Sequence, residues 1–230
     1  MNVLSYVYAA PADSGSPRAL LILLPGANMP ATDFAFHGFV EAVHRRCWPI
    51  DILAVETGVE HYLDDDIAAH LHSEIITPAL ARGVASVWIA GISLGAFGAL
   101  RYVKDYSDLI EGLLLLAPFI GSRGLIAKVE TAGGIDHWAR ATRHQTNPQQ
   151  DLLKWLGAHV CDGRDAPKIY LGFGVEDRFV AAHRLLAAIL PTANVLTTTG
   201  GHDWATWRTL WESLLDRVLL SVWVSRGGFE

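Results

Sequence analysis

The segment Gly91-Ile92-Ser93-Leu94-Gly95 holds the residue types that most directly indicate chemistry in this chain. It matches the pattern Gly-x-Ser-x-Gly and lies between a short apolar run, 86–90, and a helical pattern, 94–103. Strand, tight turn and helix is the setting that holds a serine on a strained turn with its hydroxyl exposed above a sheet. Small residues on both sides let the two backbones approach each other. The pattern therefore predicts that Ser93 is a nucleophile.

Two other interpretations of this segment stay open. Serine is a good N-cap, so the same residues suit a glycine-rich turn that merely starts a helix. Gly91, Gly95 and Gly98 also suggest a dinucleotide-binding loop. That loop has the spacing Gly-x-Gly-x-x-Gly and follows the first strand of its fold, whereas several apparent strands precede Gly91. The spacing and the position both disfavour a dinucleotide site.

A serine hydroxyl needs a neighbouring base, and that base needs an acid to orient it. In hydrolases with a G-x-S-x-G elbow the acid and then the histidine follow the serine, each just past a strand. The apolar run 168–173 is followed by Glu176 and Asp177, and the run 194–198 by Gly200-Gly201-His202. The glycine pair favours a tight turn that presents the imidazole of His202 over the sheet edge.

The choice of the acid depends on which carboxylate side chain can be held against the imidazole of His202. The short side chain of Asp177 is easier to hold rigidly against an imidazole than that of Glu176, and Asp203 is too close to His202 in the chain to orient it readily. We therefore predict a triad of Ser93, Asp177 and His202.

An acyl-transfer site also needs backbone donors for a developing oxyanion. The amide of Leu94, directly after the serine, is the first candidate. The second comes from a loop after an earlier central strand, and Leu24-Pro25-Gly26-Ala27-Asn28 occupies that place. Gly26 lets the backbone come close, so we expect the Ala27 amide to be the second donor, with the side chain of Asn28 near the substrate.

The elements that position these residues follow from the apolar pattern. Nearly continuous apolar runs suit strands covered on both faces, and helical patterns separate them. Their alternation predicts an α/β fold in which helices flank both faces of a mostly parallel sheet, within a single domain spanning 1–230. We expect strands at 18–24, 50–55, 86–90, 112–117, 168–173 and 194–198, and helices at 31–46, 64–82 with a possible kink at Pro78, 93–105, 179–190 and 204–224.

The chain resembles the α/β-hydrolases from the Leu24-Pro25-Gly26 loop to His202, and Gly200-Gly201-His202-Asp203-Trp204-x-x-Trp207 is similar to the histidine loop of the esterase D-like group. The resemblance implies acyl transfer to water through an acyl-serine. In it Ser93 attacks, His202 acts as base and then acid, and Asp177 holds the imidazole tautomer. The chain departs from the family at Ala96, where many relatives have glycine, at Pro25, where many have histidine, and in a shortened N-terminal hairpin. No particular substrate carries over.

The segment 118–159 interrupts the alternation. It contains several glycines and Pro148 and only one helical pattern, 150–159, so it is either a lid or an ordinary surface connection. Its Phe119 and Trp138 suggest an apolar substrate pocket. Trp204 is adjacent to the histidine loop and is a further candidate, although the spacing of Trp204, Trp207 and Trp211 is more typical of a helix face packed on a sheet.

Composition limits the remaining functions. The net charge of −6 and the absence of a Lys/Arg run disfavour nucleic-acid binding, and no apolar stretch has the ~20 residues of a membrane helix. Cys47 and Cys161 make no disulfide framework, and 1–10 lacks a signal-peptide pattern, so we expect a cytoplasmic protein.

Asp64-Asp65-Asp66 suits a helix start better than a metal site. We expect neither metal nor cofactor, and the sequence leaves monomer and homodimer open.

The sequence thus predicts a serine hydrolase that acts on a small or medium carboxylic ester. Four alternatives share its scaffold. A thioesterase would use a basic patch of Arg123, Lys128, Arg140 and Arg143, and a binding module would retain ligand without turnover. A peptidase lacks its usual gating domain, and a nonhydrolytic lyase stays open.

Overall fold

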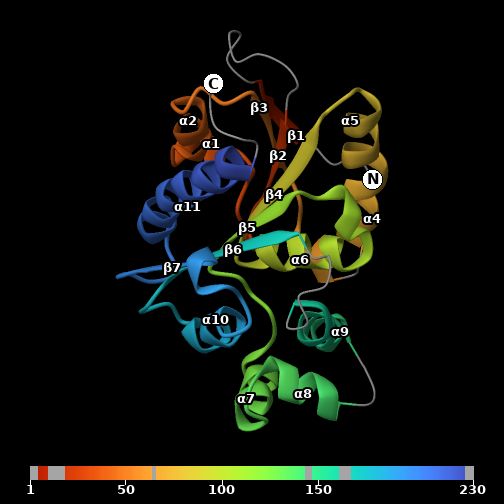
Figure 1. The fold of residues 1–230 in the computed structure, drawn as a ribbon, viewed down its shortest axis with the longest axis vertical. Coiled ribbons are helices and arrows are strands. Elements are labelled where there is room, and N and C mark those ends of the chain that lie inside the picture. The colour runs from red at the N-terminus through yellow and green to blue at the C-terminus, as the bar shows by residue number, and fades with distance from the viewer. Residues whose placement is uncertain (1–4, 10–18, 64–65, 143–146, 161–166, 226–230) are drawn as a thin grey trace.

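The computed structural model describes residues 5–9, 19–63, 66–142, 147–160 and 167–225. These residues form one seven-stranded sheet of order β1-β3-β2-β4-β5-β6-β7 (Figure 1). All neighbouring strands are parallel except β1, which pairs antiparallel with β3. The predicted α/β class is confirmed. The strands are β1 Ser5–Tyr8, β2 Ala19–Leu24, β3 Ile50–Val55, β4 Ser86–Ile92, β5 Gly112–Leu116, β6 Lys168–Gly174 and β7 Val195–Thr198.

Both faces of the sheet are buried, which explains why its strands are continuous apolar runs. Successive side chains of a strand point to opposite faces. In β5, Leu113 and Leu115 belong to one buried cluster, and Leu114 and Leu116 belong to the other. Leucines of β2 divide in the same way. The two clusters are the cores that hold the helical layers against the sheet.

Figure 1 shows the helices on the two sides of the sheet. On one side lie α1 Asp33–Phe36, α2 Phe39–His44 and α11 Trp204–Ser225. On the other side lie α3 Val59–Leu63, α4 Asp66–His70, the π-helical turn η1 Leu71–Ile76, α5 Thr77–Ala81, α6 Leu94–Tyr106, the 3-10 turn η2 Ser107–Leu109 and α10 Val180–Ala187, which leads to the 3-10 turn η4 Thr192–Asn194. None of the helices in the described ranges has the length and apolarity needed to cross a bilayer.

The prediction of one helix over 31–46 was wrong. The structure has two short helices, α1 and α2, separated at Gly38, whose φ of 76° is left-handed. A Cβ at Gly38 would lie 2.0 Å from Nη1 of Arg208, and that guanidinium donates to the carbonyl oxygen of His37 at 2.7 Å. The break is therefore stabilised by a residue of α11, far away in the sequence.

The predicted helix 64–82 also differs. Asp64 and Asp65 lie outside the described residues, and from Asp66 onward α4, η1 and α5 follow one another. A proline ring clashes with the carbonyl four residues before it. The wider π-helical turn of η1 directly precedes α5, where Pro78 lies in the first turn, and it gives the ring room. The segment ends before Gly83, as predicted.

The segment 118–159 has more helix than the sequence indicated. It contains α7 Arg123–Thr131, α8 Ile135–Ala141, α9 Pro148–Trp155 and the π-helical turn η3 Leu156–Val160. Side chains cap two of these helices, since Ser122 Oγ accepts from the Leu125 amide and Asn147 Oδ1 accepts from the Gln150 amide. Apolar residues of all three helices belong to the same buried cluster as α6. This packing, which short helical patterns do not reveal, stabilises the segment.

Candidate active site

Ser93 lies at the turn between β4 and α6 in a conformation that non-glycine residues rarely adopt, with φ 53° and ψ −110°. Three backbone hydrogen bonds hold it there. Its amide donates to the Leu116 carbonyl at 2.9 Å, and its carbonyl accepts from the amides of Phe97 at 3.3 Å and Phe119 at 3.0 Å. Strained residues persist when their surroundings determine them in this way. The turn therefore fixes the Ser93 hydroxyl above the carboxyl end of β4.

The glycines on either side of Ser93 are required by close backbone contacts. A Cβ at Gly91 would lie 2.5 Å from the amide nitrogen of Ala96, and a Cβ at Gly95 would lie 2.1 Å from the carbonyl oxygen of Leu24. Real Cβ atoms essentially never come this close to backbone. The first contact closes the turn on itself, and the second places the start of α6 against the end of β2.

A continuous chain of polar contacts joins Ser93 to a buried carboxylate. His202 Nε2 lies 3.0 Å from Ser93 Oγ, and His202 Nδ1 lies 2.7 Å from Asp177 Oδ2. The other carboxylate oxygen, Asp177 Oδ1, accepts from the Phe179 amide at 2.8 Å. An imidazole that donates from Nδ1 to the carboxylate has Nε2 free to accept the serine proton. The structure thus brings together the three residues of the predicted triad.

The environment keeps Asp177 ionised. Its side chain is buried, which by itself raises the pKa of the carboxyl group. The hydrogen bonds from His202 and from the Phe179 amide outweigh the burial, so the pKa of Asp177 is lowered from its ordinary value. Glu176, the rejected neighbour, is exposed. Asp203 instead accepts a hydrogen bond from the Thr206 amide at 2.9 Å, at the start of α11.

The loops after β6 and β7 meet closely. The Val175 amide donates to the Thr198 carbonyl, and the Glu176 amide donates to the Gly200 carbonyl. A Cβ at Gly174 would lie 2.2 Å from the Gly200 carbonyl oxygen, and Gly200 itself has a φ of 114°. These contacts need glycine at both positions, and they bring the acid loop and the histidine loop together.

Two aromatic rings pack against the imidazole: Phe179, which the sequence did not single out, and Trp207, which belongs to the histidine-loop motif. The centroid of the Phe179 ring lies 5.1 Å from that of His202, and the Trp207 centroid lies 5.0 Å away on an edge-to-face contact. Edge-to-face packing restricts ring rotation and is favourable by about 0.5–1.5 kcal/mol per pair. A weak sequence signal existed, since Phe179 is two residues past Asp177 and Trp207 belongs to the first turn of α11.

The two predicted oxyanion donors are the backbone amides of Leu94 and Ala27. The Leu94 amide is the first of α6, and a Cβ at Gly26 would lie 3.4 Å from Ser93 Cβ, so the loop that carries Ala27 touches the serine. Within the described part of the chain neither amide donates to a protein acceptor. An oxyanion site needs backbone N–H groups that are free of protein acceptors, and these two amides meet that condition.

The four residues predicted to contact substrate lie in different surroundings. Asn28 is exposed on the loop beside Ser93, and Phe119 is half-buried 6.2 Å from Phe179. Trp204 stacks on His37 at 4.1 Å and touches the edge of Trp207, so it is one ring removed from the imidazole. Trp138 is buried in α8, which packs on α7, α9 and η3 at the foot of the molecule in Figure 1.

No group of three or more His, Cys, Asp or Glu in the described ranges is arranged to hold a metal ion. The polar partners of Ser93 are instead His202 and, through it, Asp177. Because His202 links the Ser93 hydroxyl to the Asp177 carboxylate, this arrangement can move the serine proton to Nε2 and stabilise the imidazolium that forms.

Comparisons with known proteins find the fold but no close relative in sequence. No protein-family model matches the chain, and no curated protein matches it. Among solved structures it is similar to S-formylglutathione hydrolase of Staphylococcus aureus, with a TM-score of 0.64 and 12% identity over 94% of this chain and 98% of that one. It is also similar to the fluorophosphonate-binding serine hydrolase F of Staphylococcus aureus, with a TM-score of 0.62 and 14% identity over 94% and 98%.

A third similar structure is Est1E of Butyrivibrio proteoclasticus, with a TM-score of 0.61 and 16% identity over 94% of this chain and 93% of that one. All three alignments include nearly the whole of both chains, so the shared architecture extends across the sheet and its helical layers. The parallel sheet of order β3-β2-β4-β5-β6-β7, with the Ser93 turn after β4, agrees with that architecture. The chain has the α/β-hydrolase fold.

Proposed function

We propose that this chain is a serine hydrolase that cleaves small or medium carboxylic esters through an acyl-serine intermediate. The observation that carries the proposal is the chain of contacts from Ser93 Oγ to His202 Nε2 at 3.0 Å and from His202 Nδ1 to Asp177 Oδ2 at 2.7 Å. The rest of the site supports it, because Leu94 and Ala27 have amides without a protein acceptor among the described residues, Leu94 directly follows Ser93, and the loop that carries Ala27 touches Ser93 at Gly26.

The proposed reaction has two halves. Ser93 Oγ attacks the ester carbonyl carbon while its proton moves to His202 Nε2, and the Leu94 and Ala27 amides bind the oxyanion that forms. The intermediate collapses, the alcohol leaves with the proton from His202, and the acyl group stays on Ser93. In the second half, water gives a proton to His202 Nε2 while its oxygen attacks the acyl carbon of the acyl-serine. The bond from that carbon to Ser93 Oγ then breaks, His202 returns the proton to Ser93 Oγ, and the carboxylic acid leaves. Asp177 stabilises the imidazolium in both halves.

The substrate class rests on the aromatic side chains that lie close to the triad. Phe179, Trp207 and Phe119 lie around or near the imidazole, and apolar and aromatic walls suit an acyl or aryl group. The similar structures include proteins named as esterases, and the histidine loop resembles that of the esterase D-like group. These likenesses favour an ester over an amide bond.

Covalent labelling tests the proposal directly. A fluorophosphonate probe is expected to add once per folded chain, with the phosphonyl group on Ser93 by peptide mass analysis. Ser93→Ala is the control, and it should keep its melting temperature within a few degrees while losing both the adduct and ester turnover. A folded wild-type chain without an adduct would contradict the proposal.

Thioester hydrolysis is the second candidate on the same triad. One similar structure is named for S-formylglutathione, a thioester, and Arg123 and Lys128 are exposed on α7. Arg140 of the basic patch pairs with Asp136 at 2.7 Å, and Arg143 lies outside the described residues. Turnover rates for oxygen esters and thioesters that carry the same acyl group distinguish an esterase from a thioesterase. Turnover of thioesters alone would favour this candidate, and ligand retention without any turnover would favour a binding module.

A further inference from the structure

A buried tyrosine is bonded to the loop that carries the proposed second oxyanion donor. Tyr62 of α3 has only 1% of its surface exposed, and its hydroxyl donates to the Pro25 carbonyl oxygen at 2.9 Å. A buried hydroxyl needs a partner, and the partner here is a carbonyl at the start of the loop rather than a group of its own layer. Ala27, the proposed donor, follows Pro25 by two residues.

The Pro25 carbonyl lies where the loop meets the start of α6. A Cβ at Gly95 would lie 2.6 Å from the Pro25 carbonyl oxygen, and a Cβ at Gly26 would lie 3.4 Å from Ser93 Cβ. The Pro25–Gly26 peptide is therefore packed between the Tyr62 hydroxyl and the Ser93 turn. The Ala27 N–H belongs to the next peptide, Gly26–Ala27, whose carbonyl is held in the turn by the Met29 amide. A movement of the Pro25–Gly26 peptide therefore moves and reorients this N–H together with the turn that carries it.

The remainder of the loop is fixed without Tyr62. The Met29 amide donates to the Gly26 carbonyl, and Asn28 has a φ of 59°. At the far end the Ala31 amide donates to Glu56 Oε2 at 2.8 Å. The loop thus has an internal turn in the middle, a carboxylate anchor at its end and one side-chain anchor at its beginning, which is Tyr62.

Tyr62 is itself held against the helix that carries the first donor. A Cβ at Gly98 of α6 would lie 2.6 Å from Tyr62 Cε1, so the ring packs directly on the helix backbone. Leu94 begins the same helix. The two proposed donors belong to separate segments, and the Tyr62 ring touches one segment while its hydroxyl binds the other.

We infer that Tyr62 is a positioning residue that sets the direction of the Ala27 amide relative to the Leu94 amide, through the Pro25 carbonyl. The inference rests on the proposed function, since it concerns how an oxyanion is bound. A preorganised donor is worth about 10²- to 10³-fold in turnover, and a displacement of about 1 Å can cost about 10²-fold. A partial loss of alignment should therefore slow acylation without weakening the binding of the uncharged ester.

Tyr62→Phe removes only the hydroxyl. With a p-nitrophenyl ester, kcat is expected to fall by about tenfold or more while KM stays within about twofold. A trifluoromethyl ketone, whose adduct with Ser93 carries an oxyanion, should bind more weakly by about the same factor as kcat/KM. Oxyanion alignment predicts this agreement, and a general loss of packing does not.

Tyr102→Phe is the matched control. Tyr102 is a fully buried tyrosine of α6 whose hydroxyl lies 3.4 Å from His72 Nδ1, and not at the loop. Its loss should lower the melting temperature by an amount similar to that of Tyr62→Phe while kcat and inhibitor affinity stay near the wild-type values. Gly98→Ala is a second variant, because the added methyl group displaces the Tyr62 ring with its hydroxyl still present. It should lower kcat and ketone affinity in parallel, with KM again unchanged.

The outcomes separate this inference from the proposed function. A wild-type chain that neither reacts with a fluorophosphonate at Ser93 nor hydrolyses the ester overturns the proposed function and the inference with it. A wild-type chain that reacts, together with a Tyr62→Phe chain of unchanged kcat and ketone affinity, overturns the inference alone. Equal losses of kcat in Tyr62→Phe and Tyr102→Phe overturn it as well.

Discussion

His202 Nε2 lies 3.0 Å from Ser93 Oγ although 109 positions separate the two residues in the chain. Ser93 follows β4 near the middle of the sheet, whereas His202 follows β7 at its edge, with β5 and β6 between them. The loop after β7 must therefore reach back across two strand ends. The left-handed Gly200 and the aromatic contacts of the imidazole support this reach, so the contact depends on both.

The two aspartates beside His202 should respond differently to loss of charge. Asp177→Asn cannot hold the imidazole in the correct tautomer, and we expect kcat to fall by about 10³- to 10⁴-fold. Asp203→Asn keeps an oxygen that can accept from the Thr206 amide, so kcat should stay within about threefold. Steady-state ester hydrolysis measures both, and a large loss in Asp203→Asn alone would reassign the acid.

Asp177 should also contribute to acid stability. Because hydrogen bonding lowers its pKa in the folded chain despite burial, the folded carboxylate holds its proton less tightly than the unfolded one. The stabilisation is fully present above the unfolded pKa of about 3.9 and is lost as pH falls through the lower folded pKa. Urea unfolding of wild type and Asp177→Asn should show a stability difference that shrinks from about pH 5 downward. A difference that grows toward acid would contradict this.

Gly95 and Gly124 provide a matched pair of Gly→Ala substitutions. A methyl group at Gly95 meets the Leu24 carbonyl and forces β2 and its loop away from Ser93, so we expect at least about a 10²-fold loss of kcat. At Gly124 in α7 a methyl group has nothing within 4 Å. There the substitution should raise the free energy of unfolding by about 0.4–1 kcal/mol with kcat unchanged, as thermal melts and hydrolysis rates can test.

Phe179 should influence turnover through the imidazole that it touches. Phe179→Leu removes an edge-to-face contact with His202 worth about 0.5–1.5 kcal/mol, and we expect kcat to fall by about two- to tenfold. Phe36→Leu is the control, since Phe36 is 83% exposed on α1. Equal rates for wild type and Phe179→Leu would show that the imidazole needs no aromatic support there.

Glu212 links α11 to the two arginines that directly follow α2. Its carboxylate accepts from Arg45 at 2.6 Å, Arg46 at 2.9 Å and Arg208 at 3.3 Å. Partial burial raises the pKa of Glu212, but the hydrogen bond from Arg46 and the other guanidinium charges outweigh it and lower the pKa overall. Glu212→Gln should reduce the free energy of unfolding by about 1 kcal/mol, and by less at high salt.

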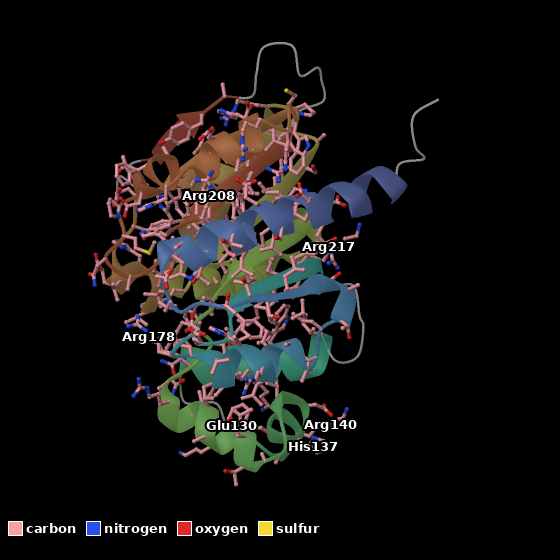
Figure 2. The ribbon with its side chains drawn as sticks, turned by 90° about the vertical axis from the view of Figure 1, so that its left-hand side faces the viewer. Glu130, His137, Arg140, Arg178, Arg208 and Arg217 are labelled. Carbon is pink, nitrogen blue, oxygen red and sulfur yellow. The ribbon has the colours of Figure 1, made fainter. Side chains whose placement is uncertain are left out.

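Glu130 is the matched control for that substitution. It is exposed on α7, which Figure 2 shows at the foot of the molecule, and Arg208 is labelled far from it. Glu130→Gln should change the free energy of unfolding by no more than about 0.5 kcal/mol. Equal effects of the two variants in urea unfolding would mean that the arginines around Glu212 add nothing to stability.

The positions of the residues that directly follow strands were predictable from the sequence. Parallel strands buried on both faces leave continuous apolar runs, and the ends of those runs located Ser93, Asp177 and His202. The spacing of Gly200 and Gly201 indicated the turn before the histidine. These signals are local, because each depends on a few neighbouring residues.

The contacts between elements were not predictable in this way. The helix break at Gly38 depends on Arg208, whose guanidinium binds the His37 carbonyl from 171 positions away. Tyr62 belonged to no predicted element, and its bond to Pro25 exists only because α3 packs on α6. The helices α7 and α8 are short, and glycines separate them, so their stability comes from a shared core rather than from a long periodic pattern.

Trapping of the acyl intermediate tests whether Ser93 is the nucleophile. Wild type and Ser93→Ala would be mixed with a p-nitrophenyl ester, quenched in acid within the first turnover, and analysed by intact mass and peptide mapping. We expect one acyl group per wild-type chain, located on Ser93 and formed at the rate of the nitrophenol burst, and neither adduct nor burst in Ser93→Ala. Turnover that persists in Ser93→Ala, or an acyl group on another residue, would contradict this role of Ser93.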